Sequence, residues 1–193
     1  MESEPLFDLR GRTVAVNPHV PLANTLDSLL RLHADLRRWR EPITLYLGLH
    51  TDFHQPLPAL DTLMICGVIA SLRSRVVTVG LGLLTGHEAL VLASGSERFL
   101  LPQALVCVGG ADATHLPHGF PGLNPSDASL RTEACEQINR EISSLIRQLG
   151  LAPDLWRKTQ ILSADKAIKL GLADQLVPAI PLNPIPHHAP PEH

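Results

Sequence analysis

The chain has 193 residues, a length typical of one domain or of one domain with a small appendage. Hydrophobic residues make up 45% of the composition and charged residues 18%, so the disordered and fibrous classes are excluded. The formal net charge of −3 offers no basic surface for nucleic acid or for an anionic membrane, and neither is expected as a partner.

The cysteines and the N-terminal residues indicate a compartment. Cys66, Cys107 and Cys135 are odd in number and far apart, unlike the paired spacing of a disulfide or zinc framework. The first residues are acidic and lack the features of a secretory signal, and no run approaches the roughly 18 apolar residues of a membrane span. We expect a cytoplasmic protein, or one of the plastid stroma if a transit peptide has been removed.

The first half of the chain alternates between strand and helix patterns. Short β-branched or continuous apolar runs predict strands over residues 13–16, 43–49 and 76–84. Apolar residues at helical spacing predict helices over residues 24–40, 59–71 and 86–93. The third of these helices is apolar enough to be buried, and Gly95 is expected to end it in the left-handed conformation.

The second half is dominated by one long helix. A strand is predicted over residues 104–108, followed by an irregular segment rich in Gly and Pro over 109–125. Residues 126–150 form a helical pattern with one wide apolar face, and a short helix over 163–170 begins at a Ser N-cap. The alternation of strands and helices calls for parallel strands joined by crossover helices, so the predicted fold class is α/β.

Several short segments together form a recognisable pattern. They are Ile-Thr-Leu-Tyr-Leu-Gly-Leu-His-Thr-Asp from Ile43, Val-Val-Thr-Val-Gly-Leu-Gly from Val76, Glu-Ala-Leu-Val-Leu-Ala-Ser-Gly from Glu88, Arg-Phe-Leu-Leu-Pro-Gln-Ala-Leu-Val from Arg98, Ser126-Asp127-Ala128, Leu-Ser-Ala-Asp-Lys-Ala from Leu162 and Gly-Leu-Ala-Asp from Gly171. In this order and spacing they resemble the Clp protease proteolytic-subunit family, ClpP and its inactive relatives. The likeness spans about residues 10 to 177.

The resemblance implies a fold and a division of the chain. The fold is the ClpP/crotonase-like spiral of repeated ββα units with a protruding handle helix, in a single domain over residues 1–177. The head would comprise about residues 10–108 and 151–177, and the handle about 109–150. The remaining residues, 178–193, are rich in Pro and His and are expected to form a flexible tail.

The resemblance also implies which positions correspond to the family's catalytic triad. Counting along the family's motifs puts Gly86 at the nucleophilic Ser, Gly109 at the general-base His and Thr159 at the Asp. Serine hydrolysis needs a hydroxyl, a base and a group that orients the base. The oxyanion region is altered as well, at Thr51, Asp52 and His87. The resemblance therefore implies a pseudoenzyme, similar to ClpR, and not an enzyme.

Two other arrangements offer chemistry and also have plainer interpretations. With a one-residue slip in this count Thr85, two residues before His87, becomes a candidate hidden nucleophile, but with Glu88 three residues later it also fits a capping box at the start of a helix. His50, Asp52 and His54 have a spacing possible for zinc and equally fit solvated loop residues, because no further ligand is identifiable. We expect no metal and no cofactor.

The expected function is structural. The chain would fill positions beside a catalytic ClpP-type paralogue in a mixed hetero-oligomeric heptameric ring, supporting assembly and the docking of an AAA+ Clp unfoldase. An apolar stripe on the long helix would either contact the handle of an opposing ring or pack in the subunit's own core; its residues are Ile138, Ile142, Leu145 and Leu149. The alternatives are a crotonase-like enzyme with a non-triad mechanism and a regulatory module that caps the ring.

Overall fold

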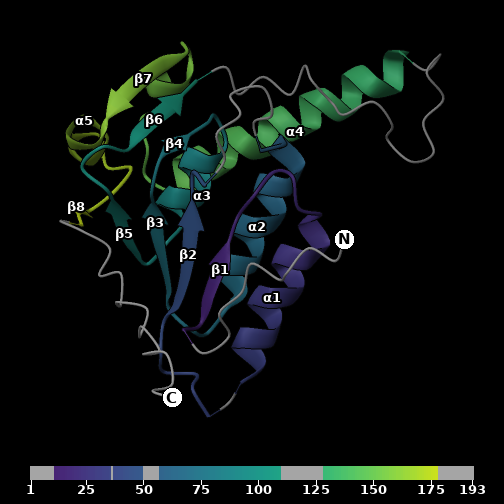
Figure 1. Cartoon of the computed structure of the whole chain (residues 1–193). Coiled ribbons are helices and arrows are strands. Elements are labelled where there is room, and N and C mark those ends of the chain that lie inside the picture. The colour runs from purple at the N-terminus through teal and green to yellow at the C-terminus, as the bar shows by residue number, and fades with distance from the viewer. Residues whose placement is uncertain (1–10, 36, 50–56, 110–127, 178–193) are drawn as a thin grey trace, which may run out of the picture.

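Two sheets and a layer of helices make up the chain (Figure 1). The structure, a computed structural model, describes residues 11–35, 37–49, 57–109 and 128–177. The larger sheet is parallel throughout, with strand order β1-β2-β3-β5-β8. Its strands are β1 (Thr13–Ala15), β2 (Ile43–Leu47), β3 (Val76–Gly80), β5 (Glu97–Leu100) and β8 (Gln175–Leu176).

The smaller sheet has three strands in the order β4-β6-β7. In it β4 runs parallel to β6, whereas β7 runs antiparallel to β6. The three strands are β4 (Leu83–Leu84), β6 (Leu105–Val108) and β7 (Gln160–Ser163). Because β3 continues almost directly into β4, the chain passes from one sheet to the other within a few residues.

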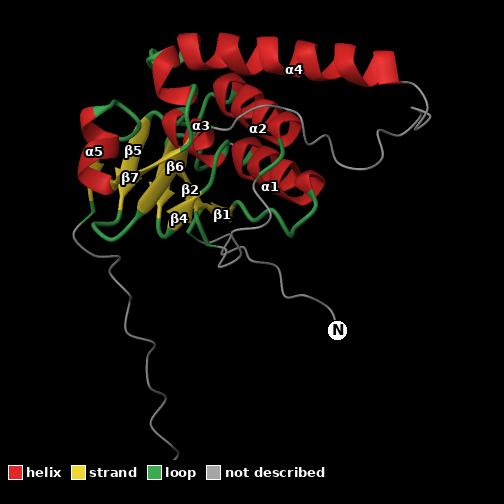
Figure 2. Cartoon of the chain, turned by 90° about the horizontal axis from the view of Figure 1, so that it is seen from above, coloured by secondary structure: helices red, strands yellow, loops and turns green. Residues whose placement is uncertain are grey.

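The helices are α1 (Leu22–Ala34), α2 (Ala59–Ser71), α3 (Glu88–Ala93), α4 (Ala128–Gln148) and α5 (Ala164–Lys169), with a 3-10 turn over Pro153–Trp156. Helices α1, α2 and α3 lie on one side of the sheets, and α4 runs across α2 and α3 with its N-terminal part extending past the body (Figure 2). None of the described helices is long and apolar enough to cross a membrane.

The two faces of the parallel sheet differ in their surroundings. On β2 the residues facing the helices, Ile43, Leu45 and Leu47, are completely buried, whereas Thr44 and Tyr46 on the other face are only partly buried. No described helix lies over that second face of β1, β2 and β3 (Figure 2). Parallel sheets are ordinarily covered by helices on both faces, and this sheet lacks a helical layer on one of them. We call it the open face, although Ala15 and Val79, in register with Tyr46 on that face, are each only 7% exposed.

Helix α4 packs into the subunit's own core. Ile138, Ile142 and Ile146, spaced four residues apart, are 7%, 3% and 5% exposed, and they belong to the same apolar cluster as the sheet. Leu145 and Leu149 are partly buried against that cluster. The prediction that the stripe meets another ring is therefore wrong for Ile138 and Ile142. These two side chains are already covered within one chain, where α4 packs against α2.

The predicted α/β class with parallel strands is confirmed, with some changes of detail. The single strand expected over 76–84 is two strands, β3 and β4, in different sheets. Between them Gly82 packs closely on the end of β2, since a Cβ on it would lie only 2.7 Å from the carbonyl oxygen of Gly48. Gly95 does not end α3 in the left-handed conformation. A glycine is needed at position 95 for another reason, because a Cβ there would lie 2.4 Å from Thr78 Oγ1. The irregular segment before α4 and the tail 178–193 lie outside the described residues.

Candidate functional site

The three positions that the sequence analysis assigned to a triad, Gly86, Gly109 and Thr159, come together at one edge of the small sheet. We call them the triad positions. Gly86 follows β4 and Gly109 follows β6, and because these strands are parallel their carboxyl ends share an edge. Thr159 immediately precedes β7, which is antiparallel to β6, so the amino end of β7 lies at the same edge. Residues more than 70 positions apart in the sequence are thus brought to one place by strand pairing.

Gly109 has no room for any side chain. Its φ is +87°, and a Cβ would lie 2.2 Å from the carbonyl oxygen of Lys158 and 2.8 Å from the backbone nitrogen of Thr159. Real Cβ atoms do not approach backbone atoms this closely. The pairing of Val108 with Gln160 holds the two segments together, so a side chain at position 109 would require the backbone before β7 to move.

Gly86 differs from Gly109 in what it requires. Apart from Gly86 itself and its two neighbours in the chain, no described atom lies within 4 Å of the point where its Cβ would be, so a side chain would have space. Its φ of +45° is in the left-handed region, which residues other than glycine adopt at some cost. Position 86 is therefore restricted by backbone conformation, and position 109 by both conformation and contact.

Polar groups in the turn after β4 are paired with one another. The backbone N–H of Thr85 donates to Glu88 Oε2 over 2.8 Å, and the Thr85 hydroxyl donates to the same oxygen over 3.0 Å. Glu88 is completely buried, and its own N–H donates to the Thr85 carbonyl over 2.9 Å. The carboxylate reaches back as in a capping box, but the Thr85 hydroxyl bonds that carboxylate and not the helix backbone, so the capping interpretation is confirmed in part.

His87 fixes this turn against the start of α2. Its Nδ1 lies 3.1 Å from the carbonyl oxygen of Leu57, and since a carbonyl only accepts, Nδ1 carries the proton and donates. The ring is 8% exposed. The other two residues of the predicted oxyanion region, Thr51 and Asp52, lie outside the described residues, as do His50 and His54 of the weighed zinc site.

Two glycines missed by the sequence analysis hold the site's surroundings in place. Gly48 ends β2 with φ +72°, and a Cβ on it would lie 3.1 Å from the Leu83 carbonyl oxygen. Gly82 in turn approaches Gly48, as described above, so the end of β2 packs directly on the bend that leads into β4. The available signal was a Gly inside an otherwise continuous apolar run, which often marks a close backbone approach.

The described side chains at this edge allow a limited chemistry. Thr85 offers a hydroxyl whose proton is held by a buried carboxylate, and His87 offers an imidazole oriented by a backbone carbonyl. Residues two positions apart at a helix start do not face each other, and the Thr85 hydroxyl is bonded to Glu88 while His87 Nδ1 is bonded to the Leu57 carbonyl. These two groups therefore do not form a nucleophile and base pair. Over residues 11–35, 37–49, 57–109 and 128–177, no cluster of three or more His, Cys, Asp or Glu residues could hold a metal ion.

No family of known proteins matches the chain by sequence. No curated protein matches it either. Solved structures do match: a peptidase from Plasmodium falciparum is 20% identical with a TM-score of 0.67, over 89% of this chain and 98% of that chain. Another, described as an enzyme, is also 20% identical with a TM-score of 0.67, over 91% of this chain and 100% of that chain. The chain therefore has a peptidase-like α/β fold.

The comparison corrects one expectation. We predicted that the chain is not an enzyme, yet the two solved proteins that share its fold are described as a peptidase and as an enzyme. This finding contradicts the prediction and points to an enzyme. An identity of 20% establishes the common fold and carries no particular reaction from one protein to the other.

Proposed function

We propose that this chain is a ring-forming subunit of a Clp-type proteolytic core, which takes a ring position beside ClpP-type subunits and helps to dock an AAA+ unfoldase. The observation that carries the proposal is a pair of apolar surfaces on different layers of the molecule, one with partly exposed aromatic side chains and one with exposed aliphatic side chains. We call them the sheet surface and the helix surface.

The sheet surface lies on the open face of the parallel sheet. Tyr46, Val79 and Phe99 are in register across β2, β3 and β5, so their side chains stand side by side on that face. Tyr46 and Phe99 are partly exposed although both are large and apolar or aromatic. Aromatic side chains in such a position typically complete their burial against a partner.

The helix surface lies on the opposite layer. Leu60 and Met64, one turn apart on α2, are 42% and 44% exposed, and Leu30 on α1 is 49% exposed. Helix α2 is apolar on nearly all sides, a pattern typical of a helix buried on all sides. Its outer side is nevertheless uncovered within a single chain.

Two different apolar surfaces favour head-to-tail association. When the sheet surface of one subunit meets the helix surface of the next, each subunit still has a free surface of the other kind, and the contact repeats until a ring closes. Burial of each aliphatic or aromatic side chain would contribute roughly 1.5 to 3 kcal/mol before the cost of association. Tyr46, Phe99, Leu30, Leu60 and Met64 do not belong to the subunit's core cluster, so we expect the isolated subunit to fold without this contact.

Helix α4 supplies a possible contact between two rings. Its N-terminal part extends past the body of the subunit (Figure 2). Leu130 on this part is 45% exposed, in contrast to the buried isoleucines further along the helix. In the proposal this extended part acts as the family's handle, and the residues that meet an opposing ring lie there and not in the stripe predicted from the sequence.

Co-expression with a ClpP-type paralogue, followed by native mass spectrometry, tests the proposal. We expect a ring of fixed stoichiometry that contains both chains. Tyr46→Asp on the sheet surface and Met64→Glu on the helix surface should each abolish incorporation while the circular dichroism of the subunit is unchanged. Ile161→Glu is the matched control, because Ile161 is 63% exposed but belongs to neither surface. Titratable addition without fixed stoichiometry, the behaviour of a ring cap, would contradict the proposal.

A second candidate is an enzyme on the related crotonase-like scaffold with a non-triad mechanism. The specific observation in its favour is the buried Glu88 carboxylate beside the Thr85 hydroxyl, at the edge where the triad positions meet. Incubation of the pure chain with acyl-CoA thioesters and with fluorogenic peptides separates the two. Thioester turnover that is lost in Glu88→Gln, a change that keeps an acceptor for Thr85, would favour this candidate over the ring subunit.

A further inference from the structure

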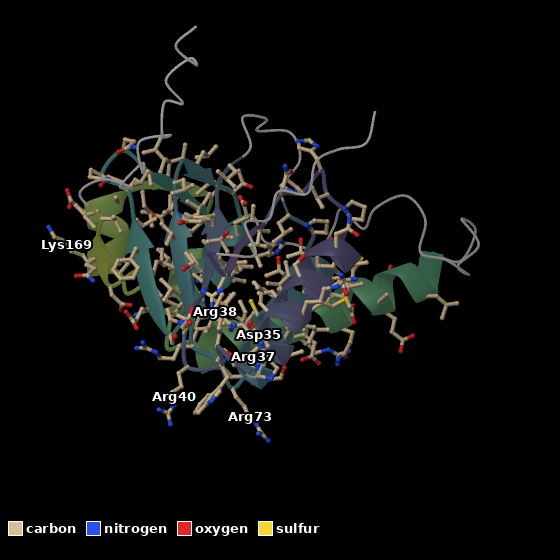
Figure 3. The ribbon with its side chains drawn as sticks, turned by 60° about the horizontal axis from the view of Figure 1, so that its bottom comes forward. Asp35, Arg37, Arg38, Arg40, Arg73 and Lys169 are labelled. Atoms are coloured by element: carbon tan, nitrogen blue, oxygen red, sulfur yellow. The ribbon has the colours of Figure 1, made fainter. Side chains whose placement is uncertain are left out.

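Arginines gather on two neighbouring loops at the far end of the molecule from the triad positions. Arg37, Arg38 and Arg40 lie between α1 and β2, and Arg73 lies between α2 and β3. Because β2 and β3 are parallel, both loops are at the amino ends of adjacent strands. Figure 3 shows the four side chains at the same end of the molecule, with Arg40 and Arg73 pointing away from the ribbon.

The two loops are fixed to each other. The hydroxyl of Ser74, a residue that is 4% exposed, donates to the Trp39 carbonyl over 3.2 Å. The Ile43 N–H donates to the Arg75 carbonyl over 2.9 Å at the start of the two strands. Within the first loop Arg38 Nε donates to Glu41 Oε2 over 2.7 Å, an ion pair that lowers the pKa of Glu41. The backbone beneath the arginines is therefore a preorganised platform.

Three arginines on this platform have no carboxylate partner among the described residues. Arg38 is paired with Glu41, but Arg37, Arg40 and Arg73 form no ion pair there. The Arg40 guanidinium lies 5.2 Å from the centroid of the Trp39 ring, and Trp39 is 47% exposed. We call Arg37, Trp39, Arg40 and Arg73 the arginine–tryptophan patch.

Helix dipoles explain only part of this arrangement. Arg37 and Arg73 follow the C-terminal ends of α1 and α2, where a positive charge is favourable. That interaction falls off within the last turn, so it gives no reason for Arg40 near the start of β2. It also gives no reason for an exposed indole with a cation over its face. Trp and Arg are among the residue types enriched at the energetic centres of protein interfaces.

We propose that the arginine–tryptophan patch is a docking site for an acidic peptide segment of a partner protein. Arg binds carboxylates through two parallel N–H donors, and Trp39 supplies a flat apolar surface for a side chain between the acidic residues. Nucleic acid fits less well, because specific affinity for it usually requires many phosphate contacts and the chain as a whole has a net charge of −3. The proposal holds for the isolated subunit and does not depend on ring assembly.

Binding to the full chain tests the proposal directly. The probe is a short fluorescein-labelled peptide in which Glu and Asp alternate with Leu, followed by fluorescence anisotropy. The comparison probes are the same peptide with Lys in place of the acidic residues, a single-stranded oligonucleotide and vesicles that contain phosphatidylserine. We expect binding of the acidic peptide alone, weakening as salt is added because exposed charges are screened.

Variants locate the binding. Arg40→Glu combined with Arg73→Glu should weaken the acidic peptide about tenfold or more, equivalent to about 1.4 kcal/mol. Trp39→Ala should also weaken it, and Trp39→Phe should restore part of the affinity through its ring. Lys169→Glu is the matched control, because Lys169 lies on α5 away from the patch (Figure 3). This substitution changes the net charge by the same amount as each Arg→Glu substitution.

Each other result overturns the proposal. Equal weakening by Lys169→Glu would show a general effect of charge. Tighter binding of the oligonucleotide or of the vesicles, lost in the same variants, would assign the patch to a different class of partner. Lower thermal stability of Arg37→Ala and Arg73→Ala with no change in peptide binding would show that these arginines only stabilise helix ends.

Discussion

The two faces of the parallel sheet both carry large apolar or aromatic side chains, but these side chains lie in different environments. On the covered face Ile43, Leu45 and Leu47 are inaccessible to solvent beneath α1 and α2, whereas Tyr46 on the open face is partly exposed. Strand alternation assigns residues to one face or the other but does not say what lies over each face. The difference teaches that apolar content alone does not distinguish a residue needed for folding from one available for association.

The largest expected effect tests the distinction between residues needed for folding and residues available for association on helix α4. Ile142→Glu would place an unpaired charge in a position that is 3% exposed, and we expect a loss of about 5 kcal/mol or more in the free energy of unfolding. Urea denaturation monitored by circular dichroism measures it. Ser143→Glu, on the exposed side of the same helix, should change stability by less than about 0.5 kcal/mol. If the Ile142→Glu variant folds with an unchanged free energy of unfolding, Ile142 is exposed and the assignment to the core is wrong.

The two glycines at the triad positions give the next effect in size. Gly109→Ala should cost about 4 kcal/mol, since its Cβ would meet the Lys158 carbonyl oxygen at 2.2 Å on a left-handed backbone. Gly86→Ala has space and should cost only about 1 kcal/mol for the left-handed conformation. Thermal melting of the two variants compares them. Equal losses would mean that the segment before β7 moves freely away from Gly109.

The sheet itself offers a matched pair of neighbouring residues. Leu45→Ala on the covered face should lower the free energy of unfolding by about 3 kcal/mol, because it leaves a cavity in a fully buried position. Tyr46→Ala on the open face should cost less than about 1 kcal/mol in the isolated subunit and should instead weaken ring formation. Denaturant titration and analytical ultracentrifugation measure the two effects. A large stability loss from Tyr46→Ala would mean that the open face is covered within the chain.

The last of these effects is confined to alkaline pH and is close to zero at neutral pH. Burial raises the pKa of the Cys66 thiol from 9.0 to about 11, with the Ser94 hydroxyl partly opposing the shift. Since the folded pKa is the higher one, stability is fully present below about pH 9 and falls as the pH rises toward about 11, by up to about 3 kcal/mol. Cys66→Ala should remove this component of the alkaline decline. Cys107→Ala is the control, because that thiol is partly exposed, and an equal effect of both changes would contradict the assignment.

The prediction of secondary structure succeeded where one pattern covered a whole element. The helices over 59–71 and 163–170 and the strand over 43–49 match α2, α5 and β2 to within two residues. Strand β5 was missed because Glu97 and Arg98 interrupt its apolar pattern, and both side chains are held in ion pairs with distant residues. β8 has only two residues, and no local pattern identifies so short a strand.

The sequence predicted that three distant positions belong together, and their role as a site stays a prediction. Family-like spacing pointed to Gly86, Gly109 and Thr159, and strand pairing does bring them to one edge. Local pattern also suggested the bond between Thr85 and Glu88. The contact of Gly109 with the backbone before β7 could not be predicted from the sequence. It joins segments about 50 residues apart and depends on the register of an antiparallel pair of strands.

The sequence by itself determined the α/β class, the alternation of its elements and the aliphatic nature of the core, because each of these depends on residue type and local period. Only the tertiary structure decided which apolar rows are covered. The long helix shows why: its isoleucines repeat at the same spacing whether they face the core or a partner, and the packing of α4 on α2 alone selects the core. For the same reason the open sheet face and the arginine–tryptophan patch emerge only when segments far apart in the chain are placed side by side.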